Sequence, residues 1–398
     1  MQDDVVGLIV TGGKSLHTGV TGDDPALTPF AGRYRFLDFA LATLANSGVR
    51  DVYVLAPPAA RAVAAHVAGT ASMLPARRRP HLLPLRDADG IGRAGRLSQA
   101  LESARAIAHE HAAGTVVVLL ADHVLHLDLR LPVAAQRRAG ADAMLMAFPV
   151  PAAEAHVRTV LDVDGGGRVR AIRPAAPLPA GSDGGPAFAL SWAGDLVLRT
   201  SALSSRRAHA TRRAHSLQAL LESEGVMAYD VLDGDRPQAA YWHEPTSVEE
   251  YYDAHMQLCS ARSPLDLHDP AWPMPALPTG LAPARVVADE VGRQGQALNA
   301  IVSEGTMVRG GVVLNAVVSP RVRVESGAEV EDAVLLEGCR IGRHARVRRA
   351  VIGAGAVIED GAEIGFGSSF AGIDPRPSGL TLVPAATCAP AAVAANAR

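Results

Sequence analysis

The chain has 398 residues, of which 48% are hydrophobic, and a formal net charge of −3 at pH 7. This length allows two or three domains with enough apolar material for their cores, and the near-neutral charge with short, dispersed arginine clusters argues against a nucleic-acid partner. The acidic first residues and the lack of an 18-residue apolar run predict neither a signal peptide nor a membrane helix, so we expect a cytoplasmic protein with no membrane contact.

The first half of the chain alternates apolar strands with helical patterns. We expect strands at residues 5–10, 51–56, 115–120, 143–150 and 192–198, and helices at residues 35–45, 59–68, 95–111, 131–139 and 247–261. Residues 157–173 have the pattern of a β-hairpin. Strands that alternate with helices predict an α/β fold with a mostly parallel sheet, and ligands of such sheets bind at the carboxyl ends of the strands. Here those ends carry Gly12-Gly13 and Asp122.

The carboxyl-terminal half contains an internal repeat of 17 residues. Aliphatic residues recur in three columns with spacings of 6, 6 and 5 within each turn: Ile301, Val318, Leu335 and Ile352; Met307, Val324, Ile341 and Ile358; Val313, Val330, Val347 and Ile364. A coil of three short strands, each with one aliphatic side chain pointing inward, produces this spacing. The repeat therefore predicts a parallel β-helix.

Composition changes suggest the domain boundaries. A proline-rich stretch precedes the repeat, and the last residues are rich in alanine. We expect an α/β domain at residues 1–262, a linker at 263–298, a β-helix at 299–384 and a frayed tail at 385–398.

Several stretches resemble one family almost letter for letter: residues 29–39, 46–49, 121–123, 241–242, 269–273 and most of 299–365. Together they resemble the sugar nucleotidyltransferases, above all ADP-glucose pyrophosphorylase (glucose-1-phosphate adenylyltransferase). The resemblance implies a Rossmann-like nucleotidyltransferase domain followed by a left-handed β-helix. It also implies the conversion of ATP and glucose-1-phosphate to ADP-glucose and pyrophosphate, in glycogen or α-glucan biosynthesis.

The resemblance implies roles for individual residues. Asp122 matches the catalytic, metal-binding aspartate, and Glu244 stands at the second metal-binding carboxylate, so that Mg²⁺ would be the cofactor. The nucleotide would contact Gly12, Gly13, Lys14, Arg33 and Gly95, and the sugar phosphate would contact Arg173 and Ser191. A nucleoside triphosphate and a sugar phosphate are the implied ligands, and a homo- or hetero-oligomer, a tetramer in this family, is the implied assembly.

The sequence departs from the family where the phosphates bind. In the nucleotide loop, His17 replaces the family's arginine, and Asp23 and Asp24 stand where the family carries a basic run. The family's Gly-Thr-Ala near the adenine becomes Gly95-Arg96-Leu97. Carboxylates and phosphates repel each other. Two interpretations follow: an adenylyltransferase with a degraded site, or a non-catalytic regulatory or structural subunit that works with an active paralogue.

Overall fold

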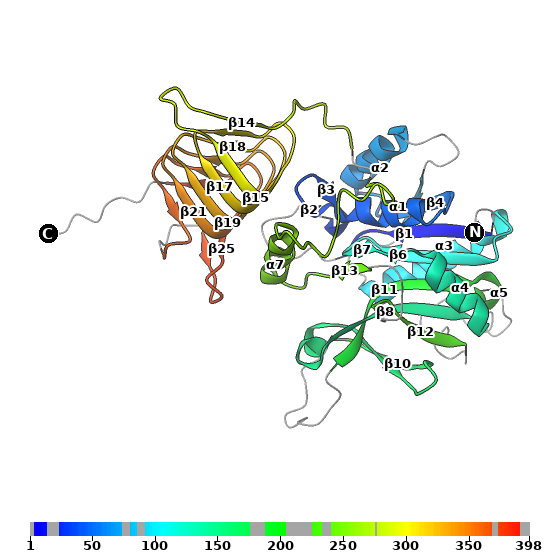
Figure 1. Cartoon of the computed structure of the whole chain (residues 1–398). Coiled ribbons are helices and arrows are strands. Elements are labelled where there is room, and N and C mark those ends of the chain that lie inside the picture. Colours follow the sequence, from blue (N-terminus) through cyan, green and yellow to red (C-terminus); the bar gives the residue numbers. More distant parts are fainter. Residues whose placement is uncertain are drawn as a thin grey trace.

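The structure is a computed structural model of the chain and describes residues 4–13, 24–73, 80–85, 92–175, 188–203, 225–232, 240–274, 277–367 and 373–390. An α/β domain and a β-helix lie side by side, with helix α7 (Val248–Leu258) between them (Figure 1). In the described part of the chain, no helix is both long and apolar enough to cross a membrane.

The α/β domain is built on one sheet, to which the described residues contribute nine strands. The central strands β6, β1, β4 and β5 run parallel, as expected, whereas β11 pairs antiparallel with β6, β8 and β9. The strands are β1 (Val5–Val10), β4 (Asp51–Ala56), β5 (His81–Pro84), β6 (Thr115–Leu120), β8 (Ala143–Pro151), β9 (Val160–Val163), β10 (Val169–Arg173), β11 (Phe188–Arg199) and β12 (Val226–Asp230).

Helices cover both faces of this sheet because its central strands are apolar on both sides. Alternate residues of β1 pack into different cores: Val5 and Ile9 lie with α1, α2 and α4, whereas Val6 and Leu8 lie with α3 and α5. The helices are α1 (Phe36–Asn46), α2 (Arg61–Met73), α3 (Arg93–Glu110), α4 (Arg130–Ala139) and α5 (Thr200–Leu203). Fully buried parallel strands are what the continuous apolar runs predicted.

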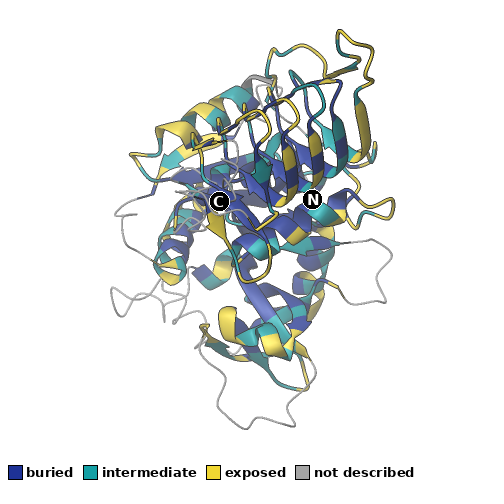
Figure 2. Ribbon diagram, turned by 90° about the vertical axis from the view of Figure 1, so that its left-hand side faces the viewer, coloured by how far each residue is buried: buried dark blue, intermediate teal, exposed yellow. Residues whose placement is uncertain are grey.

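The parallel β-helix is confirmed, and from β17 (Val312–Val318) onward its strands stack in the expected register. Figure 2 shows its buried residues along the coils and those of the sheet below. One face consists of β14 (Arg285–Val287), β16 (Met307–Arg309), β18 (Arg323–Val324), β20 (Arg340–Ile341), β22 (Val357–Ile358) and β26 (Cys388–Ala389). A second sheet holds β15 (Gln296–Val302), β17 (Val312–Val318), β19 (Glu329–Leu335), β21 (Arg346–Ile352), β23 (Glu363–Ile364), β25 (Thr381–Val383) and β24 (Asp374–Pro375).

The first coil corrects two members of the predicted columns. Val302, not Ile301, is in register with Val318, and Val308, not Met307, is in register with Val324. From Val302 to Val318 is 16 positions, one fewer than the 17 from Val318 to Leu335, so a strict period of 17 misplaces the first coil by one residue.

Both ends of the β-helix also differ from the sequence-based boundaries. Strand β14 lies within the expected linker, where it pairs with β16. Strand β26 lies within the expected frayed tail, but it pairs with β22 and buries Ala389. Residues 391–398 lie outside the described residues.

Helix α7 joins the two domains through an apolar contact. Ser247 caps its amino terminus, as expected, by accepting the Glu250 N–H. The buried Tyr251 and Tyr252 share one core with Val334 and Val351 of the β-helix. The contact makes the β-helix a fixed neighbour of the α/β domain.

Candidate functional site

Two expected carboxylates meet at the carboxyl ends of the strands. Asp122 follows β6, and the strand after it, β7 (Val124–His126), pairs antiparallel with β13 (Tyr241–His243). Glu244 follows β13. Because His243 lies opposite Val124 in this antiparallel pair, the residue after His243 and the residues before Val124 lie at the same end, which places Glu244 near Asp122. Gly12 and Gly13 follow β1, which is the parallel neighbour of β6. The geometry therefore gathers four of the expected residues at one edge of the sheet.

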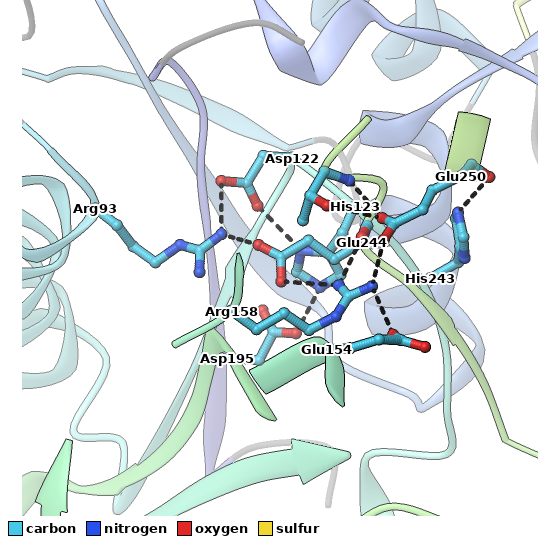
Figure 3. A network of polar contacts seen from close by, with 10 residues as sticks. Arg93, Asp122, His123, Glu154, Arg158, Asp195, His243, Glu244 and Glu250 are labelled. Atoms are coloured by element: carbon cyan, nitrogen blue, oxygen red, sulfur yellow. Dashed lines mark hydrogen bonds and ion pairs between the residues drawn. The ribbon is translucent and has the colours of Figure 1, made fainter. Parts of the chain in front are cut away.

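An arginine that the sequence did not single out lies between these carboxylates. Arg93 is the first residue of α3, and its Nη2 is 3.8 Å from Asp122 Oδ2 and contacts Glu244 Oε1 (Figure 3). Although burial opposes it, the negative charges of Asp122 and Glu244 raise the pKa of Arg93 above its usual value. Burial likewise opposes ionisation of Asp122, but Arg93, the His123 hydrogen bond and Arg96 hold the pKa of Asp122 well below its usual range. Arg93 and Asp122 therefore stay charged at neutral pH.

His123 continues the network into the core. Its Nδ1 is 3.1 Å from Asp122 Oδ1 and its Nε2 is 2.7 Å from Asp195 Oδ2, while Asp195 Oδ1 accepts the Leu120 N–H at 2.9 Å. Burial alone would lower the pKa of His123, but the carboxylates of Asp195 and Asp122 raise it to about 10. His123 is therefore a buried cation that holds Asp122 in place.

A second arginine of α3 covers the glycine loop. Arg96 Nη1 donates to the Gly12 carbonyl at 2.5 Å, and its Nη2 is 3.1 Å from Asp122 Oδ2. From the other side, Asp24 Oδ1 accepts the Gly12 N–H at 3.3 Å and the Ala26 N–H at 2.9 Å. Asp24 belongs to the segment where the resemblance implies cations, and here its carboxylate occupies the Gly12 N–H group.

Arg158 supports Glu244 from behind. It follows the 3₁₀ helix η3 (Ala152–Val157), and its Nη1 donates to the Glu244 carbonyl at 2.9 Å and lies 3.9 Å from Glu244 Oε2. Its Nη2 is 3.1 Å from Glu250 Oε1 (Figure 3). The guanidinium also lies over Trp242, 5.5 Å from the ring centre. Arg158 thus fixes the chain on which Glu244 is carried.

The remaining sequence-predicted residues lie as follows. Gly95 is in the first turn of α3, between Arg93 and Arg96. Arg33 instead contacts the Leu277 carbonyl at 2.9 Å and Glu304 at 3.4 Å, towards the β-helix. Arg173 is exposed and pairs with Asp162 at 2.6 Å, while Ser191 is buried in β11 and its hydroxyl has no partner among the described residues. Lys14, His17 and Asp23 lie outside the described residues.

The expected Mg²⁺ does not fit this arrangement. Mg²⁺ requires free oxygen ligands in near-octahedral geometry, but Arg93 contacts both Asp122 and Glu244. The described residues contain no group of three or more His, Cys, Asp or Glu side chains that could hold a metal ion. The carboxylates are together, as the metal site would need, but a cationic side chain already lies between them.

Comparison with known proteins agrees with this architecture. A nucleotidyl transferase family model matches residues 19–260, and a GlmU-like carboxyl-terminal hexapeptide model matches residues 282–371, which agrees with a left-handed β-helix. The chain is 31% identical to a glucose-1-phosphate adenylyltransferase of Parafrankia sp., over 91% of this chain and 92% of the relative. It is 26% identical to one of Deinococcus deserti, over 96% and 99%, and 30% identical to one of Anaeromyxobacter sp., over 85% and 86%.

Proposed function

This chain belongs to the nucleotidyl transferase family, among the glucose-1-phosphate adenylyltransferases, and we propose that it binds a nucleoside triphosphate and a hexose 1-phosphate at the Asp122 edge of its sheet. The observation that supports this most is the convergence of the Gly12–Gly13 loop, Asp122, Glu244 and the first turn of α3 at the carboxyl ends of parallel strands, where α/β folds bind ligands. The proposed substrates are metabolites of the cytoplasm, and the product would serve α-glucan synthesis.

The proposed reaction joins ATP and glucose-1-phosphate. A phosphate oxygen of the sugar attacks the α-phosphorus, an O–P bond forms, the bond between the α-phosphorus and the bridging oxygen breaks, and pyrophosphate leaves. Positioning and charge stabilisation carry such transfers. Among the described residues, Arg96 contacts the Gly12 carbonyl and Arg93 lies one turn before it on α3. We assign these two cations the stabilisation of the negative charge on the leaving pyrophosphate. Arg173 and Ser191 remain the proposed contacts of the sugar phosphate.

The altered loop supports a second candidate function, a non-catalytic subunit. Arg96 donates a hydrogen bond to the Gly12 carbonyl, and Asp24 accepts one from the Gly12 N–H. A loop engaged in this way binds phosphates less readily, which favours a protein that binds a ligand and regulates an active paralogue. In either case we propose an oligomer, because Val291 and Leu298 of the first β-helix coil are exposed.

The release of pyrophosphate from a nucleoside triphosphate in the presence of glucose-1-phosphate distinguishes the two candidates. The purified chain is assayed with ATP, UTP, GTP and dTTP, with Asp122→Asn as the blank, since this substitution keeps the side-chain volume. Turnover with one nucleotide that disappears in the blank supports the adenylyltransferase and names its nucleotide. No turnover, with nucleotide binding retained and an active paralogue co-purifying, supports the subunit. Absence of both turnover and binding refutes the proposed ligand class.

A further inference from the structure

Arg93 lies between the two carboxylates that the family resemblance assigns to a metal ion. The same atom, Nη2, reaches Asp122 Oδ2 at 3.8 Å and contacts Glu244 Oε1. A divalent ion held by both Asp122 and Glu244 would need their oxygens as direct ligands, at the short distances typical of Mg²⁺. The guanidinium and the ion therefore compete for one place.

The other oxygens of the two carboxylates also face cationic groups. Asp122 Oδ1 is 3.1 Å from His123 Nδ1, and Glu244 Oε2 is 3.9 Å from Arg158 Nη1. Asp122 Oδ2, which lies near Arg93, also accepts a hydrogen bond from Arg96 Nη2 at 3.1 Å. Arg93 is the only one of these four cations that reaches both carboxylates, so a dication between them would be repelled above all by Arg93.

Arg96 adds an observation that points to an anion. Its side chain is about nineteen-twentieths buried, yet its Nε–H has no acceptor among the described residues. Buried donors are almost always paired, and an unpaired one calls for a partner. This unpaired N–H belongs to the guanidinium group that lies over Gly12 and Gly13. Helix α3 begins nearby with Gly92 as its N-cap residue, and because glycine has no side chain, the first N–H groups of the helix have no side-chain cap. Arginine N–H groups and the N–H groups of a helix amino terminus are donors that bind phosphate oxygens.

We propose that the Arg93 guanidinium takes the place of the divalent cation between Asp122 and Glu244, so that this edge of the sheet binds a polyphosphate through Arg93 and Arg96 without metal. The choice of a polyphosphate rests on the proposed function, whereas the exclusion of the metal rests on the contacts alone. Arginine suits this role because its planar fork binds carboxylates and phosphates alike.

The first test is metal binding to the full chain, with Mn²⁺ alone followed by electron paramagnetic resonance. The wild type should bind no more Mn²⁺ than Asp122→Asn does. Arg93→Met removes the charge and keeps the length of the side chain, so it should gain one bound Mn²⁺ per chain, which Arg93→Met/Asp122→Asn should lose. Arg130→Met, which removes an arginine paired with Asp128 at the surface, should behave like the wild type.

Two results would overturn the exclusion of metal. One is Asp122-dependent Mn²⁺ binding by the wild type, and the other is a folded Arg93→Met variant that gains none. If Arg93→Met does not fold, Arg93→Gln replaces it, since the amide still donates to Glu244 but carries no charge. Both results are independent of turnover.

The second test uses inorganic pyrophosphate in the presence of EDTA, measured by calorimetry. The wild type should bind it, and Arg93→Met and Arg96→Met should each weaken binding at least tenfold, while Arg130→Met changes it less than twofold. No binding without metal, or binding unchanged in Arg93→Met, refutes the anion site. A chain that binds pyrophosphate but no sugar phosphate or nucleotide would refute the proposed function and leave this inference standing.

Discussion

Arg96 covers Gly13 so closely that a Cβ atom at residue 13 would lie 2.7 Å from Arg96 Nη2. The arginine cannot move aside freely, because it is held by the Gly12 carbonyl at 2.5 Å and by Asp122 at 3.1 Å. Gly13 also has a φ of +111°, in a region that only glycine adopts without strain. The loop and the first turn of α3 therefore depend on each other.

Gly13→Ala tests this dependence. We expect a loss in the free energy of unfolding larger than the cost of about 1–3 kcal/mol for the backbone strain alone, because the new methyl group also displaces Arg96. Urea unfolding measures the loss. Gly48→Ala is the matched control, since Gly48 has a φ of +82° but no atom near its added Cβ within 4 Å. Equal losses in the two variants would show that Arg96 is not held against the loop.

Asp24→Asn tests whether the partly buried carboxylate opposes the binding of phosphates. The amide oxygen still accepts the Ala26 and Gly12 N–H groups, but the negative charge is removed. We expect pyrophosphate to bind about three- to tenfold more tightly, as removal of one like charge a few ångströms away should give. Calorimetry against the wild type gives the ratio, and an unchanged or weaker affinity would contradict the expectation.

The same variant has a defined effect on stability. Burial raises the pKa of Asp24 above its usual value, against the opposing hydrogen bonds of Ala26 and Gly12 and the charge of Arg96. The ionised carboxylate therefore destabilises the native state at pH 7, and Asp24→Asn should be the more stable protein there. The difference should shrink as the pH falls through the raised pKa towards 3.8, because the wild type then becomes neutral too.

The β-helix could be predicted from the sequence because each coil repeats the same inward positions. Within the predicted columns, Ile301 and Met307 are wrong, because a strict period assigns 17 residues to the first coil as well. The residues at one corner record the difference: Asn299, Asn315 and Asp332 all have φ near +48° and are separated by 16 and then 17 positions. Asn and Asp tolerate this conformation better than most residues, so the corner would have given the correct register.

The candidate site was predictable only in part. Asp122, Gly12 and Gly13 directly follow apolar strands, and such strands can be recognised from the local sequence pattern. Arg93 was missed because its contact with Glu244 joins residues 151 positions apart, and no local pattern carries such a contact.

The sequence did offer one signal. Arg93 and Arg96 flank Gly95, the glycine that matches the family's Gly-Thr-Ala, at the start of a predicted helix. Arg96 was recognised as a departure from the family, but its contact with Gly12 required the structure.

The pH dependence of stability provides a further prediction through His255. Its ring accepts the Ala31 N–H at Nε2, is 2.8 Å from the Tyr251 carbonyl at Nδ1, and lies against Phe30. Burial lowers the pKa of His255 to about 4. The native state therefore holds a neutral ring while the unfolded chain, with an ordinary pKa near 6.5, takes up a proton.

Stability should consequently fall as the pH is lowered from about 6.5 to 4, by up to about 1.4 kcal/mol per pH unit for this one group. His255→Gln should be less stable at pH 7 but should lose less on acidification. Urea unfolding of both proteins from pH 7.5 to 4.5 gives the two slopes, and the difference isolates His255 from His243, whose pKa burial also lowers to about 4. Parallel slopes would contradict the prediction.

The last prediction concerns the first coil of the β-helix as a contact between copies of this chain. Strands β14 and β15 are at the ends of their sheets. Leu298 is 63% exposed and Val291 is 85% exposed there. An unpaired strand edge with large apolar side chains is the kind of surface that soluble proteins cover. We therefore expect the wild type to have a mass that is a multiple of 41.4 kDa by light scattering.

Leu298→Asp should shift that mass towards the monomer, because a carboxylate would be buried in the contact without a partner. Phe188→Asp is the matched control: Phe188 is 62% exposed but lies in the α/β domain, away from these strands, so its substitution should leave the mass unchanged. A monomeric wild type would refute the contact outright. A mass that falls in both variants would place the interface in the α/β domain as well, whereas a fall in Leu298→Asp alone assigns it to the first coil.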